Sequence, residues 1–318
     1  MQYIALITGD QTSLGVSELK SLVALSEGQI DKIENRVVFF RAKSIEEIVR
    51  RVTFTKYIAK LFPNPSREKR YKIIEKILDD SESRIKEVAK HIPGKVDLEN
   101  PEDIYLLLTN SDGFVMGELI YERDVSEIVR SFKRRPFNHP SSINPLLARA
   151  MINISGVKTG GTIIDPFAGT GTFLSEAQRM GIKAIGIDLS VKMVNGVIEN
   201  MKYYGFNDYT VRPGDFSQIG EYNFDAIVTD PPYGRGSKVF SETRTRLYQD
   251  LFSIIIRGNY HYSMALPNRE IYELANEYLS PILAAEIFVH RSLTRYIITD
   301  NPSIGLGLVN LVDMDDYE

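Results

Sequence analysis

Hydrophobic positions in the second half of the chain alternate between short apolar runs and longer segments with helical spacing. Three of the apolar runs are short, rich in β-branched residues and typical of buried strands: Thr162–Ile164, Ala184–Ile187 and Phe224–Thr229. Helices are predicted between and after them, over the following segments: Phe173–Met180, Val191–Tyr204 and Thr245–Arg257. This alternation predicts an α/β fold with a parallel, doubly wound sheet and helices on both faces. Short turns join three later runs that we also expect to be strands: Ala285–His290, Thr294–Thr299 and Leu308–Val312.

The first half of the chain has a mixed pattern that predicts an α+β region. Residues 15–25 carry apolar side chains at helical spacing, and Lys69–Leu78 has the pattern of a basic amphipathic helix capped by Ser66. Two runs around the turn at 110–113 predict a hairpin of Ile104–Thr109 and Phe114–Ile120. The remaining predicted elements are the strands Tyr3–Thr8 and Ile33–Phe40 and the helix Ile45–Val52, capped by Ser44.

A proline-rich stretch separates the two halves. The segment KRRPFNHPSSINP at 133–145 contains three prolines and several turn-forming residues, which interrupt any periodic pattern. We therefore predict a linker over residues 131–145, with the α/β domain at 146–318 and two smaller regions before it, at 1–52 and 53–130.

Composition excludes several classes of site. The chain has no cysteine, which excludes disulfides, thiolate metal sites and cysteine nucleophiles, and none of its four histidines forms a pair with zinc-ligand spacing. We therefore expect no metal, although these counts leave a carboxylate-bound magnesium open. No apolar run is long enough to cross a bilayer, and the N-terminal MQYIALITGD is typical of a strand, not of a signal peptide. A cytoplasmic location with no membrane contact is the expectation.

Charge is distributed unevenly along a chain whose net charge is −4. Residues 36–76 hold 12 basic and 4 acidic side chains, and a second basic cluster lies at 130–135. A phosphate backbone responds to local potential, so such a stripe is compatible with RNA binding, although a solvated helix face would look the same. The candidate RNA contacts from these clusters are Lys56, Lys60, Arg67, Lys69, Arg70 and Arg134.

A glycine loop follows the first strand of the predicted parallel sheet. In DPFAGTGT at 165–172, Gly169 and Gly171 allow the backbone to turn sharply and approach a ligand at the carboxyl edge of the sheet. Leu174 stands where a dinucleotide fingerprint has its third glycine, which disfavours NAD, the alternative ligand. Two later carboxylates follow neighbouring strands: Asp188 could bind ribose hydroxyls and Asp215 an adenine amino group, although each could instead cap a turn or helix. The candidate nucleoside-binding residues are Asp165, Pro166, Phe167, Ala168, Gly169, Gly171, Thr172, Asp188, Leu189, Asp215, Phe216 and Asp230.

The motif Asp230-Pro231-Pro232-Tyr233 follows the strand Phe224–Thr229 and is therefore expected at the same edge. An exocyclic amino nitrogen donates its lone pair into the base ring and is a poor nucleophile. A carboxylate from Asp230 and the carbonyl of Pro231 could each accept one amino hydrogen and direct the lone pair at a methyl donor. The prolines fix the loop, and Tyr233 offers a face for an unstacked base. Asp230, Pro231, Pro232 and Tyr233 are the candidate catalytic residues.

These motifs carry a family resemblance. In order and spacing, DPFAGTGTF, GID at 186–188 and TDPPYG at 229–234 resemble the amino-methyltransferases with a (D/N)PPY motif. The resemblance implies S-adenosylmethionine as the methyl donor and a Rossmann-like sheet with an antiparallel last strand. The N-terminal half resembles a ferredoxin-like segment at 1–52 followed by a THUMP domain at 53–130, through TKYIA at 55–59 and VDLENP at 96–101. THUMP domains in this family hold the acceptor end of tRNA.

The junction RPFNHPSSINPLLARA at 135–150 and the segment VHRSLTR at 289–295 resemble archaeal tRNA (guanine-10 N2)-methyltransferases. The resemblance implies a tRNA partner, with N2-methylguanosine or N2,N2-dimethylguanosine at nucleotide 10 as the product. It adds three candidate RNA contacts, of which Arg291 and Arg295 could equally form structural ion pairs: Arg235, Arg291 and Arg295. We expect a monomer.

Three alternatives stay open at this stage. Relatives acting at nucleotide 6 of tRNA share most of these features, and the same chemistry serves guanine in ribosomal RNA and adenine in DNA. A non-catalytic tRNA-binding protein with a relic methyltransferase domain is a third hypothesis. The number of methyl groups depends on the volume of the pocket, which the sequence does not reveal.

Overall fold

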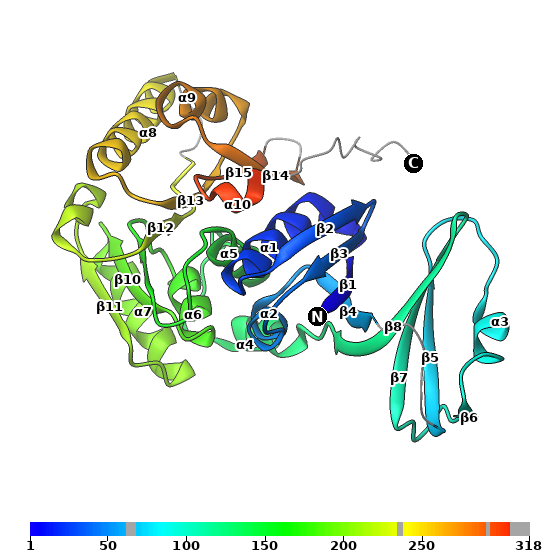
Figure 1. Cartoon of the computed structure of the whole chain (residues 1–318). Coiled ribbons are helices and arrows are strands. Elements are labelled where there is room, and N and C mark those ends of the chain that lie inside the picture. The colour runs from blue at the N-terminus through cyan, green and yellow to red at the C-terminus, as the bar shows by residue number, and fades with distance from the viewer. Residues whose placement is uncertain (62–67, 234–237, 291–292, 306–318) are drawn as a thin grey trace.

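The strands of the protein form two sheets. The computed structural model describes residues 1–61, 68–233, 238–290 and 293–305. For residues 238–244 and residue 290 it describes the backbone alone. In the described part of the chain, an eight-stranded sheet has the order β2-β3-β1-β4-β8-β7-β5-β6 and a seven-stranded sheet has the order β11-β10-β9-β12-β13-β15-β14. Figure 1 shows the first sheet extending away from the domain built on the second.

The N-terminal part has the order β1 (Gln2–Ile7), α1 (Thr12–Leu25), β2 (Gln29–Glu34), β3 (Val37–Arg41), α2 (Glu46–Arg51) and β4 (Thr55–Leu61). The predicted single strand Ile33–Phe40 was wrong. The chain reverses after Glu34, where Asn35 has a positive φ of 51°, and β2 and β3 pair as an antiparallel hairpin. The helix predicted at 45–52 is confirmed, but Ser44 contacts the side chain of Glu46 instead of capping the backbone.

Among the described residues, the end of the eight-stranded sheet that lies away from the N-terminal strands is formed by four strands and carries one short helix. Its elements are β5 (Lys69–Ile77), α3 (Ile85–Ala89), β6 (Gly94–Val96), β7 (Asp103–Asn110) and β8 (Gly113–Glu122). We call it the distal lobe (Figure 1). The hairpin predicted around 110–113 is confirmed as β7 and β8. The helix predicted over 69–78 was wrong: this segment is β5, which pairs in parallel with both β6 and β7. Ser66, its predicted cap, lies outside the described residues.

Strand β4 joins the distal lobe to the N-terminal part. It pairs antiparallel with β1 on one side and with β8 on the other, so a single sheet runs across the predicted boundary between residues 52 and 53. The boundaries drawn at 52, 130 and 145 stay predictions. Helix α4 (Ser126–Arg134) then leads from β8 into the second half of the chain.

The second half has the predicted α/β architecture. Its elements are α5 (Pro145–Ile154), β9 (Thr162–Asp165), α6 (Thr172–Arg179), β10 (Lys183–Asp188), α7 (Val191–Tyr204), β11 (Tyr209–Pro213), β12 (Ala226–Thr229), α8 (Lys238–Gly258), β13 (Tyr262–Leu266), α9 (Arg269–Leu279), β14 (Ile282–His290), β15 (Leu293–Thr299) and α10 (Pro302–Gly305). Strands β9 to β13 are parallel, and β15 inserts antiparallel between β13 and β14. The doubly wound sheet with an antiparallel last strand is therefore confirmed, whereas the strand predicted at 308–312 lies outside the described residues.

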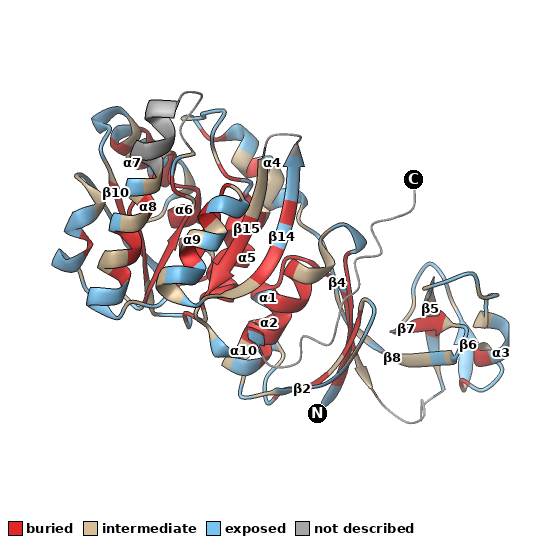
Figure 2. Ribbon diagram, turned by 90° about the horizontal axis from the view of Figure 1, so that it is seen from above, coloured by how far each residue is buried: buried red, intermediate tan, exposed pale blue. Residues whose placement is uncertain are grey.

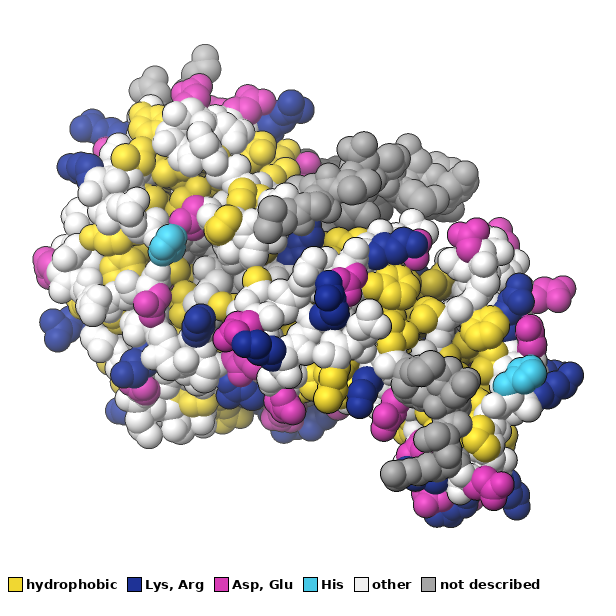
Figure 3. Space-filling model, viewed as in Figure 1, with side chains coloured by type: hydrophobic (Ala, Val, Ile, Leu, Met, Phe, Trp, Pro, Cys, Tyr) yellow, Lys and Arg dark blue, Asp and Glu magenta, His cyan; other side chains and the backbone are white. Residues whose placement is uncertain are grey.

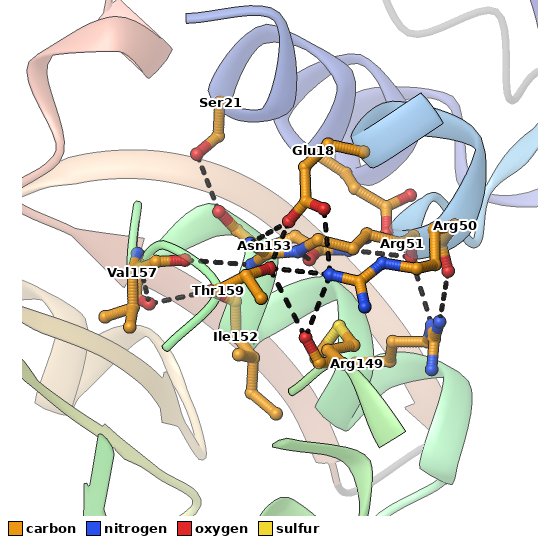
Figure 4. A network of polar contacts seen from close by, with 12 residues as sticks. Glu18, Ser21, Arg50, Arg51, Arg149, Ile152, Asn153, Val157 and Thr159 are labelled. Atoms are coloured by element: carbon orange, nitrogen blue, oxygen red, sulfur yellow. Dashed lines mark hydrogen bonds and ion pairs between the residues drawn. The ribbon is translucent and has the colours of Figure 1, made fainter. Parts of the chain in front are cut away.

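Helix α1 of the N-terminal part packs against α5 of the second half, as both views show (Figures 1 and 2). Buried polar groups join the two helices (Figure 4). Glu18, fully buried on α1, accepts hydrogen bonds from the backbone N–H groups of Thr53 (3.0 Å) and Phe54 (2.9 Å) and from the Asn153 amide (2.7 Å). Arg51, also fully buried, donates to the Asn153 side-chain oxygen across 2.9 Å. Because buried polar groups are stable only when paired, this network fixes how the two parts sit on each other.

Candidate active site

The glycine loop follows β9 and begins α6 at the carboxyl edge of the seven-stranded sheet. Gly169 (φ 51°) and Gly171 (φ 76°) both adopt left-handed backbone conformations, which residues other than glycine rarely adopt. A Cβ on Gly169 would have only one atom within 4 Å, the Phe167 carbonyl oxygen, so this side of the loop is open. A Cβ on Gly171 would instead lie 2.8 Å from Val197 of α7. One glycine thus provides open access and the other provides close packing.

Asp188, at the end of β10, holds this loop. Its Oδ2 accepts the backbone N–H of Gly169 (2.8 Å), and its Oδ1 accepts the backbone N–H of Ser190 (2.9 Å). Both oxygens keep a further lone pair, and the carboxylate is only half-buried. Leu189, beside it, is 75% exposed. This carboxylate, fixed beside an open glycine turn, offers the hydrogen-bond acceptors that the two donating hydroxyls of a ribose need.

Asp215 lies at the end of the next strand, β11, where the structure gives it a capping role. Its Oδ1 accepts the backbone N–H of Ser217 across 2.9 Å, and Gln218 returns a bond to the backbone N–H of Asp215, which completes a capping box for the 3-10 helix Phe216–Glu221. The helix cap was the alternative that the sequence left open, and the adenine contact stays a prediction. Phe216 packs on Phe167, with ring centroids 5.3 Å apart.

Asp165 is deeply buried at the end of β9. Its Oδ1 accepts the hydroxyl of Thr229 (2.7 Å) and the backbone N–H of Phe167 (3.1 Å). Burial, with a smaller contribution from the negative charges of Asp188 and Asp230, raises the pKa of this carboxyl to about 7. The carboxylates of Asp188 and Asp230 therefore both lie close enough to Asp165, at one edge of the sheet, to influence its titration.

Asp230 follows β12 directly, and its side chain is only 10% exposed. Its Oδ2 accepts a hydrogen bond from Arg295 across 3.1 Å, whereas its Oδ1 is buried without a hydrogen-bond partner among the described residues. Burial raises the pKa of this carboxyl to about 6, and Arg295 opposes that rise. An unsatisfied buried acceptor is costly unless it serves a ligand, so Oδ1 has the character of a binding atom.

Arg295 was expected to contact RNA phosphate or to form a structural ion pair. The structure places it on β15 in an ion pair with Asp230, and its Nε donates to the Tyr233 hydroxyl across 2.7 Å. Its guanidinium carbon also lies 5.3 Å from the centre of the Tyr233 ring. With these two acceptors inside the site and only 14% of its side chain exposed, Arg295 forms the ion pair that the sequence left open, and the phosphate contact stays a prediction.

The linker also reaches the glycine loop, which the sequence did not predict in detail. Arg135 is buried and donates to the hydroxyls of Thr172 (3.2 Å) and Thr170 (3.3 Å), and the Ser142 hydroxyl lies 2.9 Å from that of Thr170. Arg135 belongs to a basic cluster that was interpreted as an RNA-binding surface. Its burial shows that it instead connects the linker to the loop.

The other candidate RNA contacts have varied surroundings. Lys56 and Arg134 are exposed, and Lys60 is half-buried. Lys69 pairs with Asp103, and Arg70 pairs with Asp97 and Glu102, so these two cations are partly neutralised. Figure 3 accordingly shows basic and acidic side chains mixed over the visible face instead of one continuous basic stripe. Arg67, Arg235 and Arg291 lie outside the described residues.

In the part of the chain that the structure describes, no group of three or more His, Asp or Glu side chains is arranged to hold a metal ion. No helix in the described ranges combines the length and hydropathy that crossing a membrane requires.

Comparison with known protein families gives two matches. A family model described as "RMKL-like, methyltransferase domain" matches residues 133–277, which include the glycine loop, Asp188 and the Asp230 motif. A second model, described as "DNA methylase", matches residues 10–199.

Among curated proteins, the tRNA (guanine(10)-N2)-dimethyltransferase of Methanothermobacter thermautotrophicus is 33% identical over 280 residues, which cover 84% of this chain and 80% of the relative. The enzyme of the same name from Pyrococcus abyssi is 41% identical over 133 residues, or 40% of either chain. Among solved structures, TrmN from Thermus thermophilus has a TM-score of 0.50 and 16% identity, covering 94% of this chain and 99% of that one. The structural likeness concerns the fold, whereas the first relative spans most of both sequences.

Proposed function

Since this chain belongs to the tRNA (guanine(10)-N2)-dimethyltransferase family, we propose that it methylates the N2 amino group of guanine at nucleotide 10 of tRNA. S-adenosylmethionine supplies an activated methyl group for this reaction. The observation that carries the proposal is the buried Oδ1 of Asp230, an unsatisfied acceptor at the edge of the sheet that bears the glycine loop.

The residues present fit the methyl donor. Asp188 would bind the ribose hydroxyls, and the open side of Gly169 would allow the backbone to approach the ligand. Phe167, Leu189 and Phe216 offer apolar surface beside Asp188 for the adenine, with Asp215 as the candidate partner of its amino group. The remaining loop residues, Pro166, Ala168, Gly171 and Thr172, shape the turn.

The protein's own part in the reaction is to orient the target nitrogen. Asp230 Oδ1 accepts one amino hydrogen and the Pro231 carbonyl accepts the other, which draws the nitrogen toward tetrahedral geometry. The base, taken out of its stack, rests against Tyr233. Methylation makes the amino nitrogen acidic, and Asp230 would take the proton that it loses. Positioning supplies most of the rate enhancement, because the methyl donor is already reactive.

We assign tRNA binding to residues 53–130 and to the adjoining helix α4. The distal lobe extends away from the catalytic domain and is attached to it through a sheet and a packed helix pair (Figure 1). Lys56, Lys60 and Arg134 are the predicted contacts with phosphate, and the resemblance to THUMP domains supports this assignment. We further propose that the protein acts as a monomer, in the cytoplasm.

The test uses tRNA transcripts that differ at single nucleotides. The full-length protein is incubated with S-adenosylmethionine and with tRNA carrying guanosine or inosine at nucleotide 10, and the digested nucleosides are analysed by mass spectrometry. Inosine lacks the N2 amino group but keeps the rest of the ring. N2-methylated guanosine in the first transcript and none in the second supports the proposal. Equal methylation of both transcripts would show that the methylated nucleotide lies at another position, such as nucleotide 6. Ribosomal RNA serves as a further substrate control.

A further inference from the structure

Arg295 forms hydrogen bonds with both Asp230 and Tyr233, the two side chains of the Asp230 motif to which a role in the reaction is assigned. It lies on β15, the antiparallel strand, 65 residues after Asp230 in the chain. Its terminal nitrogen donates to Asp230 Oδ2 (3.1 Å) and its Nε donates to the Tyr233 hydroxyl (2.7 Å). Both members of the ion pair are at most 14% exposed. A charged group at this depth with two aimed hydrogen bonds is held in one orientation.

We propose that Arg295 is a positioning residue for methyl transfer: it occupies Oδ2 of Asp230 and the hydroxyl of Tyr233, leaving Oδ1 of Asp230 as the acceptor for the substrate's amino hydrogen. This inference rests on the proposed function. An aspartate carboxylate rotates about its last bond and exposes two equivalent oxygens unless one of them is fixed. The structure shows this asymmetry directly, with Oδ2 bonded to Arg295 and Oδ1 without a partner among the described residues.

The same contacts also orient Tyr233. The guanidinium lies 5.3 Å from the ring centre and donates to the hydroxyl, so the orientation of the tyrosine is tied to that of Arg295. Arg295 thereby orients both the aromatic ring against which the base is proposed to rest and the carboxylate toward which its amino group points.

Charge gives Arg295 a second effect. Burial raises the pKa of Asp230 to about 6, while Arg295 opposes this rise through its charge and its hydrogen bond. Asp165 faces the same carboxylate from β9, and its own pKa is raised to about 7. With Arg295 removed, the pKa of Asp230 rises further, and a larger fraction is protonated near neutral pH. A protonated Asp230 cannot receive the proton that leaves the methylated nitrogen.

The test compares Arg295→Met and Arg295→Lys with wild type and with Arg269→Met, a matched arginine on α9 that pairs with exposed Glu273. Single-turnover methyl transfer is measured from pH 5 to pH 9 at saturating S-adenosylmethionine and tRNA, together with the affinity for each. An opposite charge within about 4–6 Å lowers a carboxyl pKa by roughly 1–3 units. We therefore expect Arg295→Met to move the acidic limb of the rate profile upward by about one pH unit or more and to lower the rate at pH 7 several-fold.

Arg295→Lys, which restores a charge, should return the limb toward its wild-type position, and Arg269→Met should leave it unchanged. Asp165→Asn serves as a further control, since an acidic limb that persists in that variant does not belong to Asp165. An unmoved limb in both Arg295 variants overturns the inference, as does a weaker affinity for tRNA at an unchanged rate, which would assign Arg295 to phosphate binding. If wild type itself transfers no methyl group, the proposed function fails instead.

Discussion

The carboxylate of Glu18 on α1 accepts a hydrogen bond from the side-chain amide of Asn153 on α5 across 2.7 Å. The two residues are 135 positions apart and both are fully buried. Glu18 also accepts the backbone N–H groups of Thr53 and Phe54, immediately before β4. A single carboxylate therefore links the helix of the N-terminal part, the entry to the distal lobe and the catalytic domain.

Replacing Glu18 should destabilise the whole chain. Glu18→Ala leaves three buried donors without an acceptor, and each costs about 1–3 kcal/mol, so we expect a loss of about 3 kcal/mol or more in the free energy of unfolding. Glu18→Gln should cost less, because one amide oxygen still accepts the backbone groups while the NH₂ faces that of Asn153. Urea unfolding measures both. Glu27→Ala, an exposed residue just after the same helix, is the control, and a similar loss in that variant would contradict the role of Glu18.

Gly171 offers a second matched pair. Gly171→Ala and Gly205→Ala both place a side chain at positive φ (76° and 72°), which costs about 1–2 kcal/mol. Only the first also introduces a contact, 2.8 Å from Val197, because nothing lies within 4 Å of the position that a Cβ would take at Gly205. Gly171→Ala should therefore lower the melting temperature more and weaken binding of S-adenosylmethionine, measured by calorimetry. The double variant Gly171→Ala/Val197→Ala should recover part of both losses; no recovery would show that the contact is not the cause.

The raised pKa of Asp165 predicts that the free energy of unfolding depends on pH. Its pKa is about 7 in the folded protein and 3.8 in the reference state, so the folded protein binds this proton more tightly than the unfolded chain. The associated stability is fully present below about pH 4 and is lost as the pH rises through 7. Asp165→Asn keeps the oxygen that accepts from Thr229 and removes the charge. Relative to wild type, this variant should gain stability in urea between pH 5 and pH 8, and a difference that does not change with pH would contradict the assignment.

The second half of the fold could be predicted because its signals are local. The segments β9 to α7 repeat a short apolar run and an amphipathic helix, and the glycines and carboxylates follow strand ends by position alone. The wrong helix prediction over residues 69–78 also came from local signals. Tyr71 and Ile73 are the buried residues of β5, and their spacing of two predicts a strand, but the lysines of this segment favour a helix pattern. Ile33–Phe40 was interpreted as one strand because Asn35 and Arg36 are a weak turn signal.

The contacts that complete the site depend on distant parts of the chain. Arg295 reaches Asp230 only because β15 lies in the same sheet as β12, with β13 between them, an order that pairing in space determines. A signal did exist, since Arg295 precedes the apolar run Tyr296–Ile298, where an unpaired cation would be costly. Glu18, between Val16 and Leu19 on an apolar helix face, gave the same kind of signal. In both cases a charge in a buried pattern indicated a partner without identifying it.

The role of Asp230 is tested most directly by single-turnover methyl transfer with Asp230→Asn at saturating S-adenosylmethionine and tRNA. Asparagine keeps the shape of the side chain but loses the charge, and it can present an NH₂ where the amino hydrogen must be accepted. The rate should fall by roughly 10²–10⁴-fold while the affinity for S-adenosylmethionine, measured in parallel by calorimetry, stays near that of wild type. A variant that transfers the methyl group at close to the wild-type rate would contradict the account.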